Sequence, residues 1–230
     1  VPYITNKFDV FVSNDIMRPV ISQQESVFNF RKIMDEKKIL LVNLSKGRLG
    51  EINSNLIGLV LVGKLQMAAL SRVDMFGKDF PPFYMYIDEF QNVTTDSIAS
   101  ILSEARKYKL SLNITHQYLA QLEDPIKNAV FGNVGSMAAF RISSEDAKFI
   151  EPRFAPTFNA DDIMKIDNWN AYVSMLVKGT PTKPFNMKTL PTPEGDPRNV
   201  EKMKELSYLT YGRPREEVES EIMERFSSSL

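Results

Sequence analysis

The chain reads Pro81-Pro82-Phe83-Tyr84-Met85-Tyr86-Ile87-Asp88-Glu89-Phe90-Gln91-Asn92, an apolar segment that ends on two adjacent carboxylates. Residues 83 to 87 carry no charge and show no polar–apolar alternation, which is typical of a strand covered on both faces in a parallel sheet. Such a strand delivers Asp88 and Glu89 to its carboxyl end, where open α/β sheets bind ligands. In a nucleotide hydrolase, an Asp at this place holds Mg²⁺ and a Glu orients or deprotonates the attacking water. The alternative is an acidic pair that only caps the next helix.

A helix and a second strand are predicted directly after this segment. Residues 96 to 108 repeat their apolar positions at helical spacing, with Arg106 on the flank of the apolar face and Lys107 pointing away from it. Arg106 is therefore placed to reach across an edge, toward a neighbouring subunit. Residues 110 to 115 alternate with period two and lead to Gln117, which we expect beside the acidic pair. The order strand, helix, strand predicts a βαβ unit with a right-handed crossover.

Several ordered motifs resemble the motor domain of conjugative DNA-transfer coupling ATPases. These are the TraG/TraD-type proteins of type IV secretion, within the HerA/FtsK superfamily of hexameric DNA pumps. The likeness spans roughly residues 30 to 220 and is carried by residues 38–47, 86–92, 102–108, 115–117, 128–135, 139–142 and 211–219. It implies the C-terminal portion of a RecA-like P-loop NTPase motor domain, an α/β fold with a mainly parallel sheet flanked by helices, and a helical C-terminal tail.

The resemblance also implies roles for individual residues. Asp88 and Glu89 match the second nucleotide-site motif, with Asp88 as the Mg²⁺ ligand. Arg106 matches an arginine finger that acts in trans on the next subunit's site, and Gln117 matches the γ-phosphate sensor. The implied cofactors are ATP and Mg²⁺. The implied partners are further copies in a homo-hexamer, DNA in the ring pore, and relaxase and secretion-channel components.

One motif of that family is missing from these 230 residues, the phosphate loop G-x-x-x-x-G-K-[ST], whose backbone N–H groups cradle phosphates. The nearest candidate, residues 45 to 51, has two glycines but lacks the spacing and the terminal Lys-Ser/Thr pair. In the family the phosphate loop precedes the matched region. We therefore expect this chain to be the C-terminal half of a larger ATPase and to be inactive in hydrolysis by itself.

Composition predicts a cytoplasmic domain with a substantial core. The chain is 43% hydrophobic, has no cysteine and has a single histidine, His116, which excludes disulfides, thiolate metal sites and histidine clusters. No run approaches 18 apolar residues, so we expect no membrane span within the chain. Attachment of the full-length protein to the inner face of the cell membrane would then depend on a missing N-terminal region.

The net charge of −1 gives no evidence for DNA binding, because a protein that neutralises phosphates usually shows a basic patch. The DNA prediction rests on the resemblance. Lys46 and Arg48 follow a predicted strand and are candidates for a pore loop that contacts the DNA backbone. A solvated surface loop is the alternative, because Lys and Arg are usually exposed.

Outside the acidic-pair region the sequence predicts further α/β structure in three parts. Residues 1–36 end an upstream helical segment, residues 37–190 form the RecA-like motor core, and residues 191–230 form a linker and a helical tail. The expected elements are a strand over residues 39–44, an apolar helix over 54–72, a helix over 125–131, a strand over 135–142, an antiparallel pair over 170–177 and 184–190, and terminal helices over 200–211 and 215–226.

We therefore expect an ATP-driven DNA translocase that delivers DNA or nucleoprotein to a type IV secretion or conjugation channel. One alternative is a pilus-biogenesis ATPase of the same machinery, which shares the layout of acidic pair, arginine and glutamine. The other is a catalytically silent assembly or adaptor module that lacks the phosphate loop. The acidic final helix is a candidate docking element for a partner, with a solvated terminal helix as the alternative.

Overall fold

The computed structural model of this protein describes residues 11–75, 77, 79–94, 98, 102 and 104–228. The chain divides into two units, one made of residues 1–60 with 194–230 and the other of residues 61–193. The boundaries near residues 36 and 190 that the sequence suggests stay a prediction. The unit of residues 61–193 contains the acidic pair.

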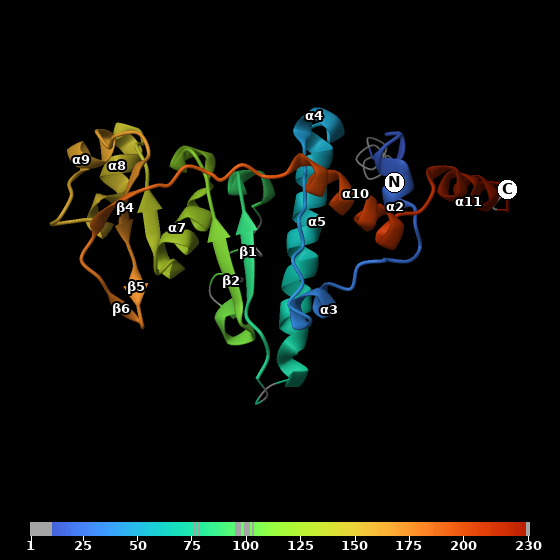
Figure 1. Cartoon of the computed structure of the whole chain (residues 1–230), viewed down its shortest axis with the longest axis horizontal. Helices are drawn as coiled ribbons and strands as arrows, with labels where there is room; N and C mark the ends of the chain where they lie inside the picture. The colour runs from blue at the N-terminus through green and yellow to red at the C-terminus, as the bar shows by residue number, and fades with distance from the viewer. Residues whose placement is uncertain are drawn as a thin grey trace. The chain divides into compact units, whose positions relative to one another are not determined.

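Two parallel strands lead to the acidic pair and to Gln117. β1 (Phe83–Ile87) pairs with β2 (Leu110–Ile114) in parallel, with Phe83 opposite Leu110 and Ile87 opposite Ile114 (Figure 1). This confirms the predicted parallel pair. The helix predicted between them, over residues 96 to 108, lies largely outside the described residues; its final part is the 3₁₀ turn η3 (Ala105–Tyr108).

The prediction that β1 is covered on both faces is wrong for the described part of the chain. Met85 is buried, but Tyr84 is 57% exposed and Tyr86 is 76% exposed, so one face of the strand is open. An uncharged run does not specify a second covering layer, because the hydroxyl end of tyrosine tolerates water while its ring remains apolar.

The expectation of a mainly parallel sheet also needs correction. The other strands are antiparallel: β3 (Met137–Ala139), β4 (Asn170–Ser174) and β7 (Phe185–Lys188) form a sheet in that order, and β5 (Leu176–Val177) pairs with β6 (Thr180–Pro181). The described chain is thus mixed α/β with small sheets. Lys178 and Gly179 both have positive φ, 52° and 82°, which is the backbone geometry of a two-residue hairpin turn. The predicted antiparallel pairing of residues 170–177 with 184–190 is confirmed through β4 and β7.

The strand predicted over residues 39 to 44 is not formed. These residues have no regular secondary structure, and Ile39 and Leu41 are 88% and 76% exposed. A strand is stabilised by ladder hydrogen bonds and by packing on a neighbour, and within the described residues no strand pairs with this segment.

Short helices lie between the strands along the chain in the unit of residues 61–193. Its core contains side chains that are fully or almost fully buried, including Phe90, Ile98, Ala147, Phe154, Ile163 and Ala171. The helix predicted over residues 125 to 131 is confirmed as α7. Besides η3 and the second half of α5 (Glu51–Leu70), the helices that the structure describes in this unit are η1 (Ser71–Met75), η2 (Phe90–Val93), η4 (Leu119–Gln121), α7 (Asp124–Asn133), α8 (Ser144–Ile150), η5 (Glu151–Arg153) and α9 (Ala160–Met164).

Helix α5 (Glu51–Leu70) continues into η1 and corresponds to the apolar helix predicted over residues 54 to 72. Together, Glu51–Met75 is the one helix of the described residues that is long and apolar enough to cross a membrane by length and composition. The expectation that no segment of the chain could span a membrane is corrected for this helix. Its polar residues interrupt the apolar run, but they do not lower the mean hydropathy of the helix below the value that a membrane span requires. A core helix of a soluble protein passes the same test, so one such helix is weak evidence for a span.

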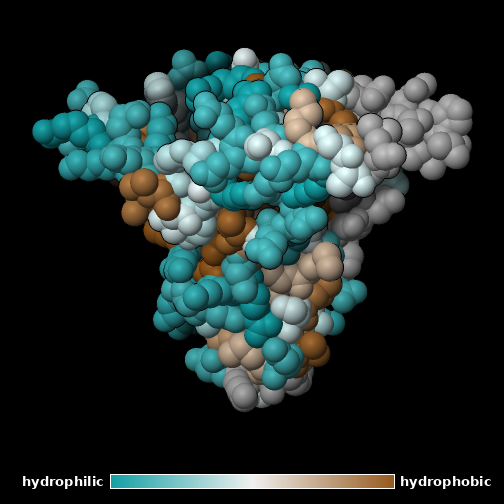
Figure 2. All heavy atoms as spheres, turned by 90° about the vertical axis from the view of Figure 1, so that its right-hand side faces the viewer, coloured by the Kyte–Doolittle hydropathy of each residue, from teal (hydrophilic) through white to brown (hydrophobic). Residues whose placement is uncertain are grey.

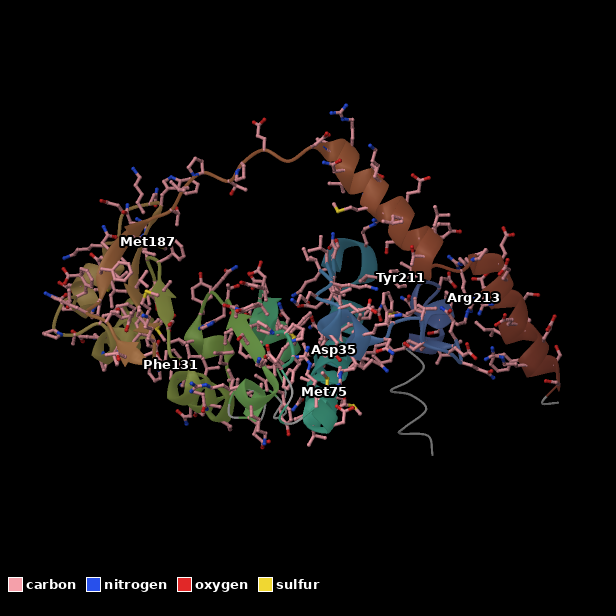
Figure 3. All side chains as sticks on the ribbon, turned by 60° about the horizontal axis from the view of Figure 1, so that its bottom comes forward. Asp35, Met75, Phe131, Met187, Tyr211 and Arg213 are labelled. Atoms are coloured by element: carbon pink, nitrogen blue, oxygen red, sulfur yellow. The ribbon has the colours of Figure 1, made fainter. Side chains whose placement is uncertain are left out.

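The other unit is helical. It contains α2 (Met17–Ile21), α3 (Phe30–Asp35), α4 (Lys46–Leu49), α10 (Pro197–Tyr211) and α11 (Arg215–Ser228), and the last two confirm the predicted terminal helices. Tyr211 stacks on Phe28 with ring centroids 5.0 Å apart, next to the junction with α11 (Figure 3). Arg225 donates to the Ser22 carbonyl at 3.1 Å. The C-terminal tail therefore packs on the N-terminal segment.

Apolar side chains also lie at the surface, as the brown atoms among hydrophilic ones in Figure 2 show. Helix α10 has no buried residue, and its exposed large hydrophobic side chains are Val200, Met203, Leu206, Tyr208 and Leu209. Helix α11 instead buries Val218 and Ile222.

Candidate functional site

The register of β1 and β2 brings the ends of both strands to one edge. Ile87 lies opposite Ile114, so Asp88 and Thr115 follow their strands at the same level. The Thr115 amide donates to the Ile87 carbonyl at 3.0 Å, and the Phe90 amide donates to the Thr115 carbonyl at 2.9 Å. These backbone bonds fix the two chain segments beyond the strands, and they place the acidic pair at the carboxyl edge as predicted.

Asp88 is exposed, and one of its two carboxylate oxygens accepts two hydrogen bonds. Its Oδ1 accepts hydrogen bonds from the Thr115 hydroxyl and from the Glu89 amide, the latter at 3.0 Å. Within the described part of the chain no donor reaches Oδ2. The side chain is thus oriented through one oxygen and offers the other to solvent or to a ligand.

Glu89 has a left-handed backbone, with φ 50° and ψ 46°. This conformation is uncommon for a residue other than glycine and costs about 1 kcal/mol. Both carboxylate oxygens are held by amides: Gln117 Nε2 donates to Oε1 at 2.7 Å, and Gln91 Nε2 donates to Oε2. Two neutral donors orient this carboxylate while leaving its negative charge uncompensated by any cation among the described residues.

The structure brings three of the predicted site residues together, namely Asp88, Glu89 and Gln117. Two further residues take part that sequence reasoning did not assign, Thr115 and Gln91. The contact of Thr115 could have been predicted from the sequence. When the two strands are parallel and in register, the first residue after β2 lies beside the first residue after β1, and Thr115 has a hydroxyl group that can donate to Asp88. The contact of Gln91 could not have been predicted in this way, since it depends on the left-handed turn at Glu89.

Arg106 does not join this cluster. It lies in η3, is exposed, and has neither a side-chain hydrogen bond nor an ion pair within the described residues. The next residue, Lys107, forms an ion pair between its Nζ and Glu104 Oε2 at 3.3 Å. Arg106 is thus an uncommitted cation on the surface of the unit.

Lys46 and Arg48 lie in α4 of the other unit, in a short helix and not after a strand. Lys46 Nζ pairs with Glu51 Oε1 at 2.8 Å, and this contact lowers the pKa of the Glu51 carboxyl. Arg48 is exposed. No contact of these two residues tests a role in binding DNA.

His116 lies between Thr115 and Gln117 and is partly buried. Burial lowers the pKa of its imidazole, and the nearby Asp146 carboxylate opposes that shift less strongly. The neutral ring is therefore favoured near pH 7. Asp146 is itself buried and accepts from the Leu119 amide at 3.3 Å.

The donor set fits Mg²⁺ in the manner of nucleotide sites. Mg²⁺ takes one or two carboxylates together with water and substrate phosphates, and does not need a dedicated protein cage. Asp88 can supply one oxygen, Oδ2. The described residues contain no group of three or more His, Cys, Asp or Glu side chains that could enclose a metal ion.

Solved structures that are similar to this chain include two distant ones. No family model matches the chain, and no curated protein matches it. A solved structure of the bacterial conjugative coupling protein TrwBdeltaN70, in an unbound form, is similar at 16% identity and a TM-score of 0.42 over 54% of this chain. The genome packaging NTPase B204 from Sulfolobus turreted icosahedral virus 2, in complex with AMPPCP, is similar at 13% identity and a TM-score of 0.49 over 73% of this chain.

The matched regions differ in how much of each neighbour they represent. The likeness covers 34% of the coupling protein, about a third of its length, and 74% of the packaging NTPase. At these identities and scores neither likeness carries an argument about what this chain binds or does.

Proposed function

We propose that this chain contributes the water-activating half of an ATP hydrolysis site in a DNA translocase of the conjugative coupling type. The observation that carries the proposal is the pair Glu89–Gln117, bonded at 2.7 Å across parallel strand ends with Asp88 beside it. Ligands of open α/β sheets bind at this edge. A carboxylate held by amides, next to a second carboxylate with one open oxygen, suits hydrolysis of a nucleoside triphosphate.

Each residue has a separate task in this proposal. Asp88 would hold Mg²⁺ through Oδ2, and the bound ion would supply positive charge against the phosphates of ATP. Glu89 orients or deprotonates the attacking water. Gln117 links the position of that carboxylate to the γ-phosphate, because one amide group can donate to Glu89 and interact with a phosphate in turn.

Arg106 would act on the site of the next subunit in a homo-hexameric ring. Its exposure and its lack of an ion pair within the described residues support this, because a finger must remain available until it meets a phosphate. Stabilisation of transition-state charge by such an arginine is worth a large factor in rate, on the order of 10³ to 10⁵.

The remaining parts of the proposal rest on the family resemblance. They are DNA as the transported substrate, contact of Lys46 and Arg48 with the DNA backbone, relaxase and secretion-channel components as partners, and work at the inner face of the cell membrane. The phosphate loop that the site needs has to come from a segment outside these 230 residues.

Two other functions stay open. A pilus-biogenesis ATPase of the same machinery would use the same four residues, and only the transported substrate would differ. A catalytically silent adaptor is favoured by one observation, the lack of a phosphate loop in the sequence. Loss of hydrolysis on a single change at Glu89 separates the enzyme from the adaptor.

The test is Glu89→Gln in a form of the protein that includes the phosphate loop. We expect ATP hydrolysis to fall at least about a hundredfold, the low end of general-base effects, while ATP still binds. Glu145→Gln is the matched control, because Glu145 is an exposed carboxylate in α8 outside the cluster. Unchanged hydrolysis in Glu89→Gln would contradict the proposed role, and absence of hydrolysis in the unaltered protein would favour the adaptor.

Arg106→Ala tests the ring. Mixed with Glu89→Gln subunits, it should regain part of the hydrolysis that each variant lacks by itself, because an intact Glu89 site on one subunit can then receive Arg106 from its neighbour. A mixture of the two variants that regains no hydrolysis argues against action in trans. ATP hydrolysis measured with and without DNA, on the same preparations, tests whether DNA is the transported substrate.

A further inference from the structure

A buried arginine lies behind the turn that carries Arg106. Arg72, in η1, is 0% exposed and is the largest fully buried side chain of the described residues. A buried guanidinium is expensive unless its donors are satisfied, so its partners indicate what it does. Its Nη1 donates to the carbonyl of Tyr108, the last residue of η3, at 3.0 Å. The guanidinium also lies 5.1 Å from the centre of the Phe80 ring.

The residues after Arg106 are tied down by several independent contacts. Lys109 has a left-handed backbone with φ 52°, and its amide donates to the Arg106 carbonyl at 3.1 Å. The Lys109 ammonium pairs with Asp79 and lies 5.3 Å from the same Phe80 ring that Arg72 contacts. The Lys109 carbonyl accepts from the Phe83 amide at 2.8 Å, which connects the turn to the start of β1.

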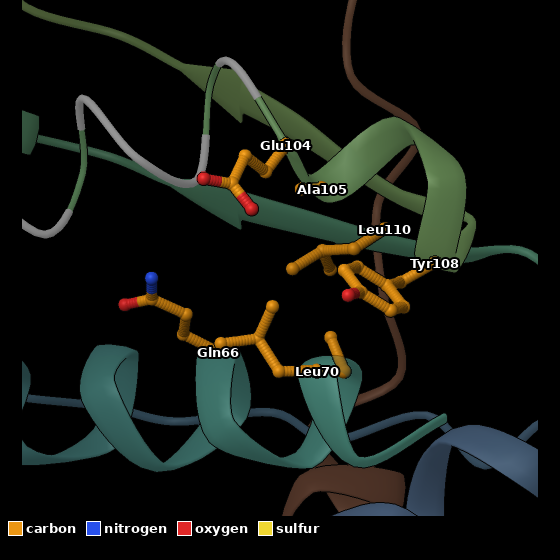
Figure 4. A pocket seen from close by; sticks show the side chains of 7 residues that line it. Gln66, Leu70, Glu104, Ala105, Tyr108 and Leu110 are labelled. Atoms are coloured by element: carbon orange, nitrogen blue, oxygen red, sulfur yellow. The ribbon is translucent and has the colours of Figure 1, made fainter. Parts of the chain in front are cut away.

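The residues beside Arg106 inside the turn are fixed as well. Ala105 is buried, and Lys107 pairs with Glu104 while its ammonium lies 5.1 Å from the Tyr108 ring. Figure 4 shows Tyr108 and Leu110 facing Leu70 of α5 across a small pocket that these side chains line. The turn is therefore packed against the second half of α5 on one side and bonded to the start of β1 on the other.

Arg106 itself contrasts with all of these neighbours. Its side chain is exposed and has no partner within the described residues, although the residues on both sides of it are held. A packed turn with one free cation limits the directions in which that cation can point. Without the bond from Arg72 to the Tyr108 carbonyl, the end of the turn loses a contact from a charged and buried donor.

We propose that Arg72 is a positioning residue for Arg106: its bond to the Tyr108 carbonyl and its stack on Phe80 fix the turn so that Arg106 is presented in one direction. The catalytic consequence rests on the proposed function of Arg106 as a finger. The structural part does not, because it concerns only the backbone of residues 105 to 109. The two parts are tested separately.

The structural part is tested by hydrogen exchange on this chain with Arg72→Met, which keeps a long apolar side chain and removes the donor. We expect the protection of the Lys109 amide to fall by about tenfold or more, because a hydrogen bond from a charged donor is lost from the end of the turn. The Ala147 amide, bonded to the Ser143 carbonyl at 2.9 Å in α8, reports on the rest of the unit and should be unchanged. Equal loss at both amides, or no loss at Lys109, overturns the proposal.

Arg72→Lys keeps a cation that can donate hydrogen bonds, but it lacks the planar guanidinium group. It should leave the protection of Lys109 between that of the unaltered chain and that of Arg72→Met, with Ala147 again unchanged. If Arg72→Met does not fold, this variant decides the structural part: protection lost at Lys109 but retained at Ala147 supports it, and any other pattern overturns it.

The catalytic part is tested in the form that contains the phosphate loop. Arg72→Met should lower kcat by about a hundredfold with an unchanged KM for ATP, since a small displacement of a catalytic group costs about that much. The double variant Arg72→Met/Arg106→Ala should be no slower than Arg106→Ala alone, because Arg72 acts through Arg106. Additive losses overturn the positioning role. If Arg106→Ala alone has no effect, the proposed function of Arg106 fails, while the exchange result on Arg72 still stands by itself.

Discussion

The amide of Gln117 donates a 2.7 Å hydrogen bond to Oε1 of Glu89, a residue 28 positions earlier in the chain. The parallel pairing of β1 with β2 makes this contact possible, because it brings the residues that follow both strands to one edge. The left-handed backbone of Glu89 then turns its carboxylate toward β2. The contact also sets what a change at either residue should do.

Replacing Gln117 with alanine removes one of the two amides that hold Glu89. In the form with a phosphate loop, we expect hydrolysis to fall about a hundredfold, the usual effect of losing one preorganised donor at a reacting group. Steady-state ATP hydrolysis measures this. Asn113→Ala is the matched control, since Asn113 is an exposed amide within β2 and four residues away; an equal loss there would mean that the strand, and not the Glu89 contact, is responsible.

Thr115→Val should weaken the use of Mg²⁺. The Thr115 hydroxyl donates to Asp88 Oδ1, and valine has a similar shape without that donor. Asp88 then loses one of the two bonds that orient its carboxylate, so a higher Mg²⁺ concentration should be needed for half-maximal hydrolysis. A Mg²⁺ titration of the rate measures the change. Thr115→Ser keeps the hydroxyl and should need the same Mg²⁺ concentration for half-maximal hydrolysis as the unaltered protein. If Thr115→Val and Thr115→Ser raise that concentration equally, the hydrogen bond is not the cause.

Gly212→Ala should destabilise the unit that contains α10 and α11. An added Cβ would lie 2.6 Å from the Tyr208 carbonyl oxygen, a backbone atom that cannot move without disturbing the end of α10. Overpacking of this kind costs about 2 kcal/mol in the free energy of unfolding. Urea unfolding checks the value. At Gly195 an added Cβ meets nothing within 4 Å, so Gly195→Ala should leave the stability almost unchanged.

His116 makes folding stability depend on pH. Burial lowers its pKa in the folded state below the ordinary value of 6.5, so the unfolded chain binds a proton at a higher pH than the folded chain does. Stability should therefore fall as the pH drops through 6.5 toward the folded pKa, and this contribution should be absent above that range. Free energies of unfolding at several pH values, compared with those of His116→Asn, isolate the effect.

The same residue allows a direct check. His116 is the only histidine of the chain, so its ring resonances are assigned without ambiguity in an NMR titration. A measured pKa at or above 6.5 in the folded protein would refute this explanation of the pH dependence.

Much of the site was predictable because it depends on local order along the chain. The uncharged run before Asp88, the alternation before Gln117 and the parallel pairing of the two strands place Glu89 and Gln117 at one edge. The helix near residues 125 to 131, the terminal helices and the antiparallel pair of β4 with β7 follow from periodicity and turn residues in the same way.

The errors arise where the outcome depends on what surrounds an element. A run such as residues 39 to 44 has strand propensity but forms no strand without a partner, and residues 83 to 87 do not reveal that Tyr84 and Tyr86 face solvent. The contact between Gln91 and Glu89 depends on a positive φ at a residue type that seldom adopts it. The packing of α11 on the N-terminal segment joins residues far apart in sequence, which no local pattern encodes.

The exposed segment over residues 39 to 44 has a consequence for the behaviour of the isolated chain in solution. Four consecutive apolar residues with high strand propensity, no proline and open backbone groups are the type of segment that recruits identical chains edge to edge. We expect the chain to self-associate as its concentration rises. Leu41 is exposed, so the variant Leu41→Lys places a charge within this segment, and we expect that variant to stay monodisperse at the same concentrations.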